Sequence, residues 1–137
     1  MNATPPEVFE RLVAAQNAHD VEALVACFAP DYASEQPAHP DRVFRGNAQV
    51  RKNWSSIFAG VPDFRAELLD AAVQGDTAWG EFEWRGTRRD GSALHSRGVI
   101  IGKTRDGKLA AARLYMSDVD EAGRGIDAAV EGLAGKR

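Results

Sequence analysis

Two predicted strands carry acidic, basic and histidine side chains at every second position. Glu81 and Glu83 alternate along one stretch, and His95 and Arg97 alternate along the next. Residues two apart share one face of a strand, so an even register across the Asp90-Gly91 turn would bring the acidic pair against the basic pair. The expected opposite pairs are Glu81 with Arg97 and Glu83 with His95. A carboxylate that orients an imidazole can transfer protons, so these four residues are the candidate catalytic residues.

The same strands allow a second arrangement. Phe82 and Trp84 alternate with the glutamates, and plain amphipathicity would turn the aromatic side chains inward and the glutamates toward solvent or a dimer contact. Trp79 and Val99 lie on the glutamate face and favour the arrangement in which that face lines a pocket. The pattern leaves both arrangements open.

Other residues that could contact a ligand lie on a loop, a helix and the last strand. His39 is held between Pro37 and Pro40, where an exposed turn residue is the simpler interpretation. Trp54 and Phe58 are four apart on a predicted helix, a spacing that is equally typical of a core.

Composition excludes several classes of protein. The 137 residues include 17 Lys and Arg against 20 Asp and Glu, for a net charge of -3, and no dense basic stripe predicts a nucleic-acid partner. The single cysteine, Cys27, allows no internal disulfide and no cysteine metal set. Phosphate-binding loops and nucleophile elbows are missing as well, so we expect no cofactor and no metal.

The apolar runs are short. The longest, Ala23 to Ala29, is too short to span a bilayer, and the first residues lack the basic and apolar regions of a secretory signal. We therefore expect no membrane partner and a cytoplasmic location.

The first half of the chain is predicted to be helical. Thr4-Pro5-Pro6-Glu7 predicts the start of a helix that ends near Asn17 to His19. Asp20 is expected to cap a second helix that ends at Pro30, and Asn47 a third that ends at Gly60. Residues 31–46 are predicted to be an ordered loop, with a short strand around Tyr32 to Glu35.

The second half changes to a strand pattern. Turn dipeptides separate runs rich in alternating apolar residues, which predicts a four-stranded antiparallel meander. The expected strands are Phe64 to Val73, Thr77 to Thr87, Ala93 to Lys103 and Leu109 to Asp118. We expect one domain over residues 1–120, followed by a tail or weak helix over residues 121–137.

Helices followed by a meander predict an α+β domain in which the N-terminal helices pack on one face of a strongly curved antiparallel sheet. Several short motifs, in this order and spacing, resemble the nuclear transport factor 2-like superfamily and its SnoaL-like polyketide cyclase and ketosteroid isomerase-related branch. They are Ala14-Ala15-Gln16-Asn17-Ala18-His19-Asp20, Leu24 to Asp31, Phe44-Arg45-Gly46, Arg85-Gly86-Thr87, Arg97-Gly98-Val99, and Asp106-Gly107-Lys108 before Arg113-Leu114-Tyr115. The resemblance implies a cone-shaped fold that encloses one apolar cavity, and commonly a homodimer.

The resemblance also allows known mechanisms to be tested against these residues. The three roles of a ketosteroid isomerase fall on Leu12, Gln36 and Val99, none of which can transfer a proton as required, so that mechanism is disfavoured. Gln36 could supply the amide of a limonene epoxide hydrolase, but Leu114 occupies the position of an acid. Relatives frequently carry an acid near Ser117, and the serine weakens a cyclase assignment.

Two hypotheses follow. In the first, the chain binds a small hydrophobic or polycyclic molecule in its cone and performs cofactor-independent cyclase, isomerase or hydrolase chemistry with the four candidate catalytic residues. In the second, it is a non-catalytic ligand-binding or dimerisation module in which Glu81 and Arg97 form a structural pair. The candidate ligand-binding residues are Tyr32, Gln36, His39, Trp54, Phe58, Trp79, Val99 and Tyr115.

Overall fold

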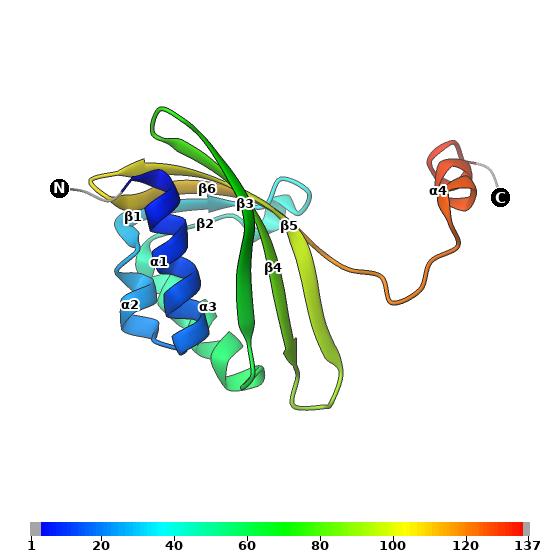
Figure 1. The fold of residues 1–137 in the computed structure, drawn as a ribbon, viewed down its shortest axis with the longest axis horizontal. Helices are drawn as coiled ribbons and strands as arrows, with labels where there is room; N and C mark the ends of the chain where they lie inside the picture. The colour runs from blue at the N-terminus through cyan, green and yellow to red at the C-terminus, as the bar shows by residue number, and fades with distance from the viewer. Residues whose placement is uncertain (1–3, 136–137) are drawn as a thin grey trace.

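The computed structural model describes residues 4–135 and consists of one sheet with helices on one side (Figure 1). The helices are α1 (Pro5–Ala18), α2 (Val21–Val25), α3 (Asn47–Gly60) and α4 (Ile126–Leu133), with a short 3-10 helix η1 (Pro40–Arg42). The strands are β1 (Phe28–Glu35), β2 (Phe44–Arg45), β3 (Arg65–Gln74), β4 (Thr77–Thr87), β5 (Ala93–Arg105) and β6 (Lys108–Asp118). The α+β class is confirmed.

The sheet has six strands in the order β2-β1-β6-β5-β4-β3. The strands from β3 to β6 form the predicted antiparallel meander. The sheet has one parallel pairing besides the antiparallel ones, because β1 pairs with β6 in parallel. A parallel partner must be reached through a long connection, so no local turn signal announces it.

The second helix is shorter than predicted. Asp20 caps it as expected, accepting a hydrogen bond of 3.0 Å from the Ala23 N–H, but the helix ends at Val25 and β1 begins at Phe28. Pro30 therefore lies inside a strand. It is tolerated there because the pairing of β1 with β6 is interrupted between Phe28 and Ala33, where a missing N–H breaks no ladder.

The third helix begins one residue earlier than predicted. Asn47 is its first residue, and the capping position belongs to Gly46, whose φ of 92° suits a glycine. At the first helix, Thr4 occupies the predicted cap position without a side-chain hydrogen bond to the helix.

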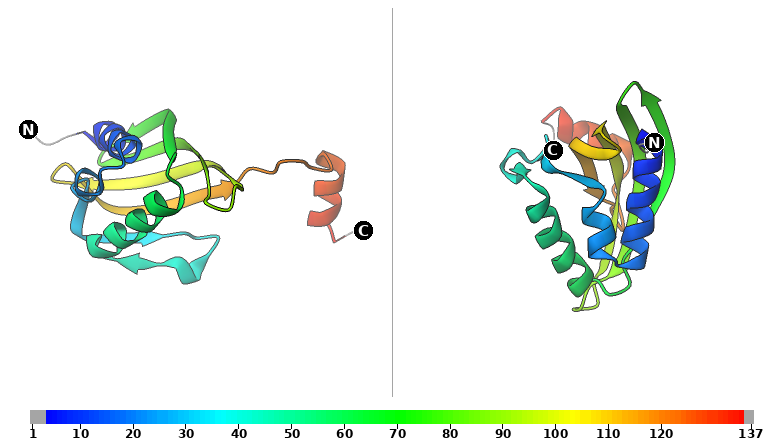
Figure 2. Two further views of the ribbon diagram at one scale, coloured as in Figure 1. Left: turned by 90° about the horizontal axis from the view of Figure 1, so that it is seen from below. Right: turned by 90° about the vertical axis from the view of Figure 1, so that its left-hand side faces the viewer.

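The helices α1, α2 and α3 cover the same face of the curved sheet, here called the inner face (Figure 2). The ring of Phe9 on α1 packs edge-on against Phe82 of β4, with ring centroids 5.1 Å apart. Gly80 and Gly102 make room for that ring, because a Cβ at either position would lie within about 3 Å of it. This close approach packs α1 directly against the sheet.

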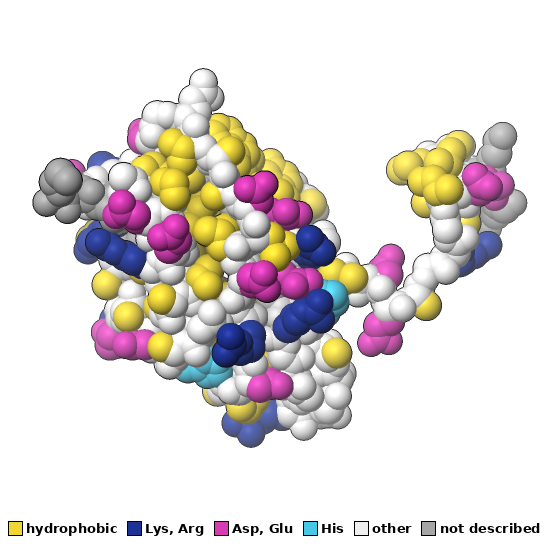
Figure 3. All heavy atoms as spheres, in the orientation of Figure 1, with side chains coloured by type: hydrophobic (Ala, Val, Ile, Leu, Met, Phe, Trp, Pro, Cys, Tyr) yellow, Lys and Arg dark blue, Asp and Glu magenta, His cyan; other side chains and the backbone are white. Residues whose placement is uncertain are grey.

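The C-terminal helix stands away from the rest of the molecule. Residues 119–125 carry α4 outward from the end of β6 (Figure 1). Its apolar side chains Ile126, Val130 and Leu133 are 75%, 53% and 90% exposed, and Figure 3 shows hydrophobic side chains gathered on it. Within the described chain, no helix combines the length and the apolar character needed to cross a bilayer.

Candidate functional site

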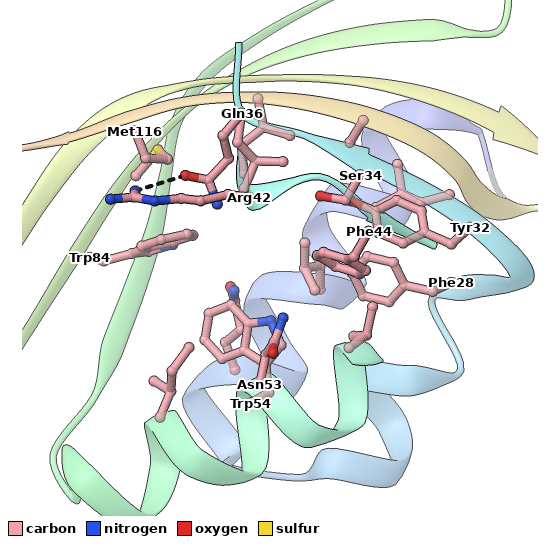
Figure 4. Close-up of a pocket in the computed structure, with 18 of the residues that line it drawn as sticks. Phe28, Tyr32, Ser34, Gln36, Arg42, Phe44, Asn53, Trp54, Trp84 and Met116 are labelled. Carbon is pink, nitrogen blue, oxygen red and sulfur yellow. Dashed lines mark hydrogen bonds between the residues drawn. The ribbon is translucent and has the colours of Figure 1, made fainter. Parts of the chain in front are cut away.

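A cavity of about 300 Å³ lies between the helices and the inner face of the sheet (Figure 4). Most of its wall is aromatic or aliphatic: Leu12, Phe28, Tyr32, Phe44, Val50, Trp54, Ile57, Trp84, Ile100, Leu109, Ala112, Leu114 and Met116. The polar lining residues are Gln16, Ser34, Gln36, Arg42, Asn53, Ser96 and Asp118. This size and composition are typical of small-molecule sites.

Strand alternation decides which side chains reach the cavity. Trp84 of β4 pairs with Ser96 of β5, and Ser96 pairs with Asp118 of β6, so all three lie on the inner face. The neighbouring positions on each strand point to the opposite face, here called the outer face.

The polar residues divide the cavity into a mouth and a floor. Arg42 and Asp118 are exposed and mark the mouth, whereas Gln16 and Ser34 are buried and belong to the floor. Figure 4 shows Gln36 and Arg42 beside Met116, across the cavity from α3. The mouth therefore offers both a cation and a carboxylate to a bound molecule.

Two hydrogen bonds hold the polar groups of the mouth. Arg42 Nη1 donates to Gln36 Oε1 at 3.1 Å, and the Ser96 hydroxyl donates to Asp118 Oδ1 at 3.3 Å. Asp118 is the only carboxylate among the described residues that line the cavity. It is therefore the group best placed to accept a proton from a ligand.

Tyr32 lies at the floor and is 3% exposed. Burial raises its pKa to about 12, because a phenolate would lose its hydration there. At neutral pH the side chain is therefore a neutral phenol, packed edge-on against Phe28 at 4.7 Å.

Three of the predicted ligand-binding residues line the cavity: Tyr32, Gln36 and Trp54. His39 and Phe58 do not. His39 precedes η1, and Phe58 packs in the core, stacked on His19 with centroids 4.6 Å apart. The other three, Trp79, Val99 and Tyr115, lie on the outer face.

The candidate catalytic residues come together, but on the outer face. Glu83 Oε2 lies 2.9 Å from His95 Nε2, and Arg97 Nη2 lies 3.8 Å from Glu81 Oε2. The sequence left two arrangements open, and the amphipathic one describes the structure, because none of the four candidate catalytic residues lines the cavity. Phe82 is fully buried and packs against Phe9 of α1. Turning the strand over would expose this ring and bury the charged glutamates, and both changes cost free energy.

The register is even as expected, but the pairing is shifted by two residues along β4 from the expected one. Glu83 lies opposite Arg97, and Arg85 lies opposite His95. The physical reason is the turn, in which Asp90 Oδ1 accepts hydrogen bonds from both the N–H and the hydroxyl of Ser92, at 2.9 and 2.6 Å. The Arg88 N–H also donates to the Ser92 carbonyl at 2.8 Å, so the hairpin is centred on Asp90 and the expected contacts form diagonally.

Glu83 is shielded although it lies outside the cavity, with a side chain only 12% exposed. The hydrogen bond from His95, followed by that from Arg85 at 3.1 Å, holds the pKa of Glu83 below its usual range. In Figure 3, acidic, basic and histidine side chains lie next to one another over β4 and β5. On the outer face, Glu83 therefore contacts both His95 and Arg85, and Glu81 pairs separately with Arg97.

Sequence reasoning missed most of the polar lining, including Arg42, Asn53, Ser96 and Asp118. For Asp118 a signal was present, since it is two residues from Met116 and four from Leu114 on an apolar strand face. For the loop and helix residues no periodic signal existed. Among residues 4–135, no group of three or more His, Cys, Asp or Glu side chains is arranged to hold a metal ion.

Comparison with known proteins agrees with this architecture. A sequence model of the SnoaL-like domain matches residues 9–112, and the chain belongs to that family. A search of curated proteins found no match.

Solved structures share the fold at low sequence identity. IdmH, a putative polyketide cyclase from Streptomyces antibioticus, is 22% identical, with a TM-score of 0.71 over 82% of this chain and 91% of that chain. A putative isomerase from Bacillus subtilis is 17% identical, with a TM-score of 0.73 over 82% and 86%. A putative polyketide cyclase from Sinorhizobium meliloti is 23% identical, with a TM-score of 0.64 over 82% and 94%. The nuclear transport factor 2-like, ketosteroid isomerase-like fold is confirmed.

Proposed function

We propose that this SnoaL-like protein binds a small, largely apolar molecule in the cavity under its helices. The observation that carries the proposal is the cavity itself, whose wall is mostly aromatic and aliphatic and whose two charged residues, Arg42 and Asp118, lie at the mouth. Its volume of about 300 Å³ is at the lower end of the range for ligand sites, which favours a ligand of one to three rings.

A pair of matched variants tests this binding. Ala112 lines the cavity and is 4% exposed, whereas its neighbour Ala111 is on the outer face. Ala112→Leu should occupy part of the cavity and weaken bicyclic aromatic probes about tenfold or more, while Ala111→Leu should leave their affinity unchanged. Isothermal titration calorimetry measures both. Equal affinities in the two variants would place the binding elsewhere.

Catalysis in the same cavity is a second candidate, favoured by the position of Asp118. Its carboxylate would take a proton from the carbon beside a ligand carbonyl, and the Arg42 guanidinium would stabilise the enolate oxygen. Returning the proton to another carbon gives isomerisation, and attack of the enolate carbon on a second carbonyl closes a ring. The putative polyketide cyclases that share the fold support this candidate.

Proton exchange provides the test of catalysis. Protein in deuterium oxide should accelerate exchange of the α protons of 2-tetralone, as followed by NMR. Asp118→Asn should remove the acceleration while 2-tetralone still binds, and Asp120→Asn, in the exposed segment after β6, should retain it. If Asp118→Asn keeps the full rate, Asp118 is not the base, and if the wild type gives no acceleration, the non-catalytic binding function remains.

We further propose that the outer face of the sheet is covered by a second copy of the chain. Apolar side chains lie side by side there, since Trp79 pairs with Ile101, and Val99 pairs with Tyr115, which is 43% exposed. Sedimentation equilibrium should give a dimer for the wild type and a monomer for Val99→Lys. Val43→Lys, at a 60% exposed position on another part of the surface, should remain a dimer.

A further inference from the structure

We propose that the ligand of the cavity carries both a hydrogen-bond acceptor and a hydrogen-bond donor, recognised by Trp84 and Gln16 respectively. This inference rests on the proposed binding function and narrows the ligand to hydroxylated or similarly amphoteric ring compounds. It excludes plain hydrocarbons of the same shape. Its basis is two buried polar atoms, Trp84 Nε1 and Gln16 Oε1, that lack a hydrogen-bond partner within residues 4–135.

Gln16 is an unusual residue for its position. It lies on the buried side of α1, is 1% exposed, and lines the cavity among apolar side chains. Glutamine is seldom fully buried, and an amide oxygen buried without a donor destabilises the folded state. An apolar residue of similar size would pack there without that cost. A ligand that donates a hydrogen bond gives the amide oxygen its missing partner.

Trp84 supplies the complementary group from the sheet. Its indole is held by Trp54, with ring planes at 90° and centroids 5.6 Å apart, and by Phe64 at 6.1 Å. These contacts fix the direction of the N–H. Because an indole nitrogen only donates, its partner must be an acceptor such as a hydroxyl, carbonyl or ether oxygen.

The two atoms belong to different elements that enclose the same cavity. One is a pure donor and the other a pure acceptor, so a ligand without polar atoms would leave both unpaired after expelling water from the cavity. A ligand with a hydroxyl and a further oxygen, or with one hydroxyl that serves both roles, would pair them. Trp84 and Gln16 are therefore specificity-determining residues of the site.

Three probes of similar shape separate the contribution of the ligand's acceptor to the affinity from the contribution of its donor. Naphthalene offers no strong hydrogen-bonding atom, 2-methoxynaphthalene offers an acceptor, and 2-naphthol offers an acceptor and a donor. Hydrophobicity alone would favour naphthalene over 2-naphthol. We expect the opposite order in calorimetric titrations, with 2-naphthol about tenfold tighter than 2-methoxynaphthalene and naphthalene weakest, because about 1.4 kcal/mol corresponds to tenfold in affinity.

Variants then assign each preference to its residue. Gln16→Met, which keeps the volume, should bring 2-naphthol down to the affinity of 2-methoxynaphthalene. Trp84→Phe should bring 2-methoxynaphthalene down to the affinity of naphthalene. Comparing probes within one variant removes any general loss of packing. Trp79→Phe, on the outer face of the same strand, and Gln74→Met, at the exposed end of β3, should leave all three ratios unchanged.

The indole N–H signal of Trp84 gives an independent readout. In a proton–nitrogen NMR spectrum the signal lost in Trp84→Phe should move on addition of 2-naphthol and stay nearly in place with naphthalene. Equal affinities for naphthalene and 2-naphthol, or unchanged ratios in both cavity variants, would overturn the inference and leave the binding function standing. A lack of binding by all three probes would contradict both.

Discussion

At the scale of single residues, burial determines the chemistry available in the cavity. Tyr32 and Asp118 both line it, but one is at the floor and the other at the mouth. Burial keeps the tyrosine protonated, so it can donate a hydrogen bond but cannot act as a base near neutral pH. The carboxylate at the mouth remains the group that can accept a proton.

The titration of Tyr32 follows from this burial. The chain has two tyrosines, so the ultraviolet absorbance of phenolate can be assigned by one variant. The step that is lost in Tyr32→Phe should centre near pH 12, above the ordinary value of about 10.

The same shift predicts alkaline instability. The folded protein retains the Tyr32 proton to higher pH than the unfolded chain does, so the free energy of unfolding falls as pH rises above about 10. Denaturant titrations from pH 9 to 11 should show a smaller decrease in Tyr32→Phe than in the wild type. Ionisation of both tyrosines together near pH 10 would show that Tyr32 is accessible to water.

Sequence reasoning found contacts more easily than it found the face on which they lie. The Glu83–His95 contact was predictable from alternation and forms at 2.9 Å, yet it lies outside the cavity. Which face turns inward depends on Phe9 of α1, which packs on Phe82 from 73 residues away along the chain. Such a tertiary contact leaves no trace in the alternation of a single strand.

At the scale of elements, the local signals were reliable and the distant ones were not. Turn dipeptides located the strands from β3 to β6, because a hairpin is encoded by the residues between its strands. The strand β1 was predicted only as a short segment, because Pro30 suggested a helix end and its partner β6 lies far along the chain. The polar lining residues of η1 and α3, Arg42 and Asn53, were also missed, because only tertiary packing brings them to the cavity.

The strands β5 and β6 lie so close together at Gly98 that a side chain there should destabilise the sheet. A Cβ on Gly98 would lie 2.0 Å from the Tyr115 carbonyl oxygen and 2.8 Å from Met116 Cα. Both are backbone atoms, so the strands must separate to admit it. Gly98→Ala should lower the free energy of unfolding by about 1–3 kcal/mol or more, as measured by denaturant titration.

Gly60 provides the control for this substitution. It lies at the end of α3, and a Cβ there would meet nothing within 4 Å. Gly60→Ala should change stability little. Equal stability of the Gly98 and Gly60 variants would mean that β5 and β6 can move apart without cost.

At the scale of the whole molecule, the body and the C-terminal helix are separate in space. Figures 1 and 2 show α4 away from the sheet and from the other helices. A chain that ends at residue 120 should therefore keep the thermal midpoint of the full chain to within about 1–2 °C. A large drop would show that α4 packs on the body in solution.

A second truncation tests where the folded body ends. The family match stops at residue 112, but β6 continues to Asp118 and pairs with β5 along this stretch. Residues 113–118 also supply Leu114 and Met116 to the cavity wall. A chain that ends at residue 112 should lose the cooperative thermal transition, as followed by circular dichroism. A cooperative transition near the wild-type midpoint would contradict this.

The central place of β6 has a consequence for how the protein is made. Among the described strands β6 comes last along the chain, yet it lies between β1 and β5 and pairs with both. On the ribosome, β1 and the helices emerge first and have no completed sheet to cover until β6 follows. The nascent chain therefore carries an uncovered apolar surface until β6 is made, and the sheet is completed only after this strand has left the exit tunnel.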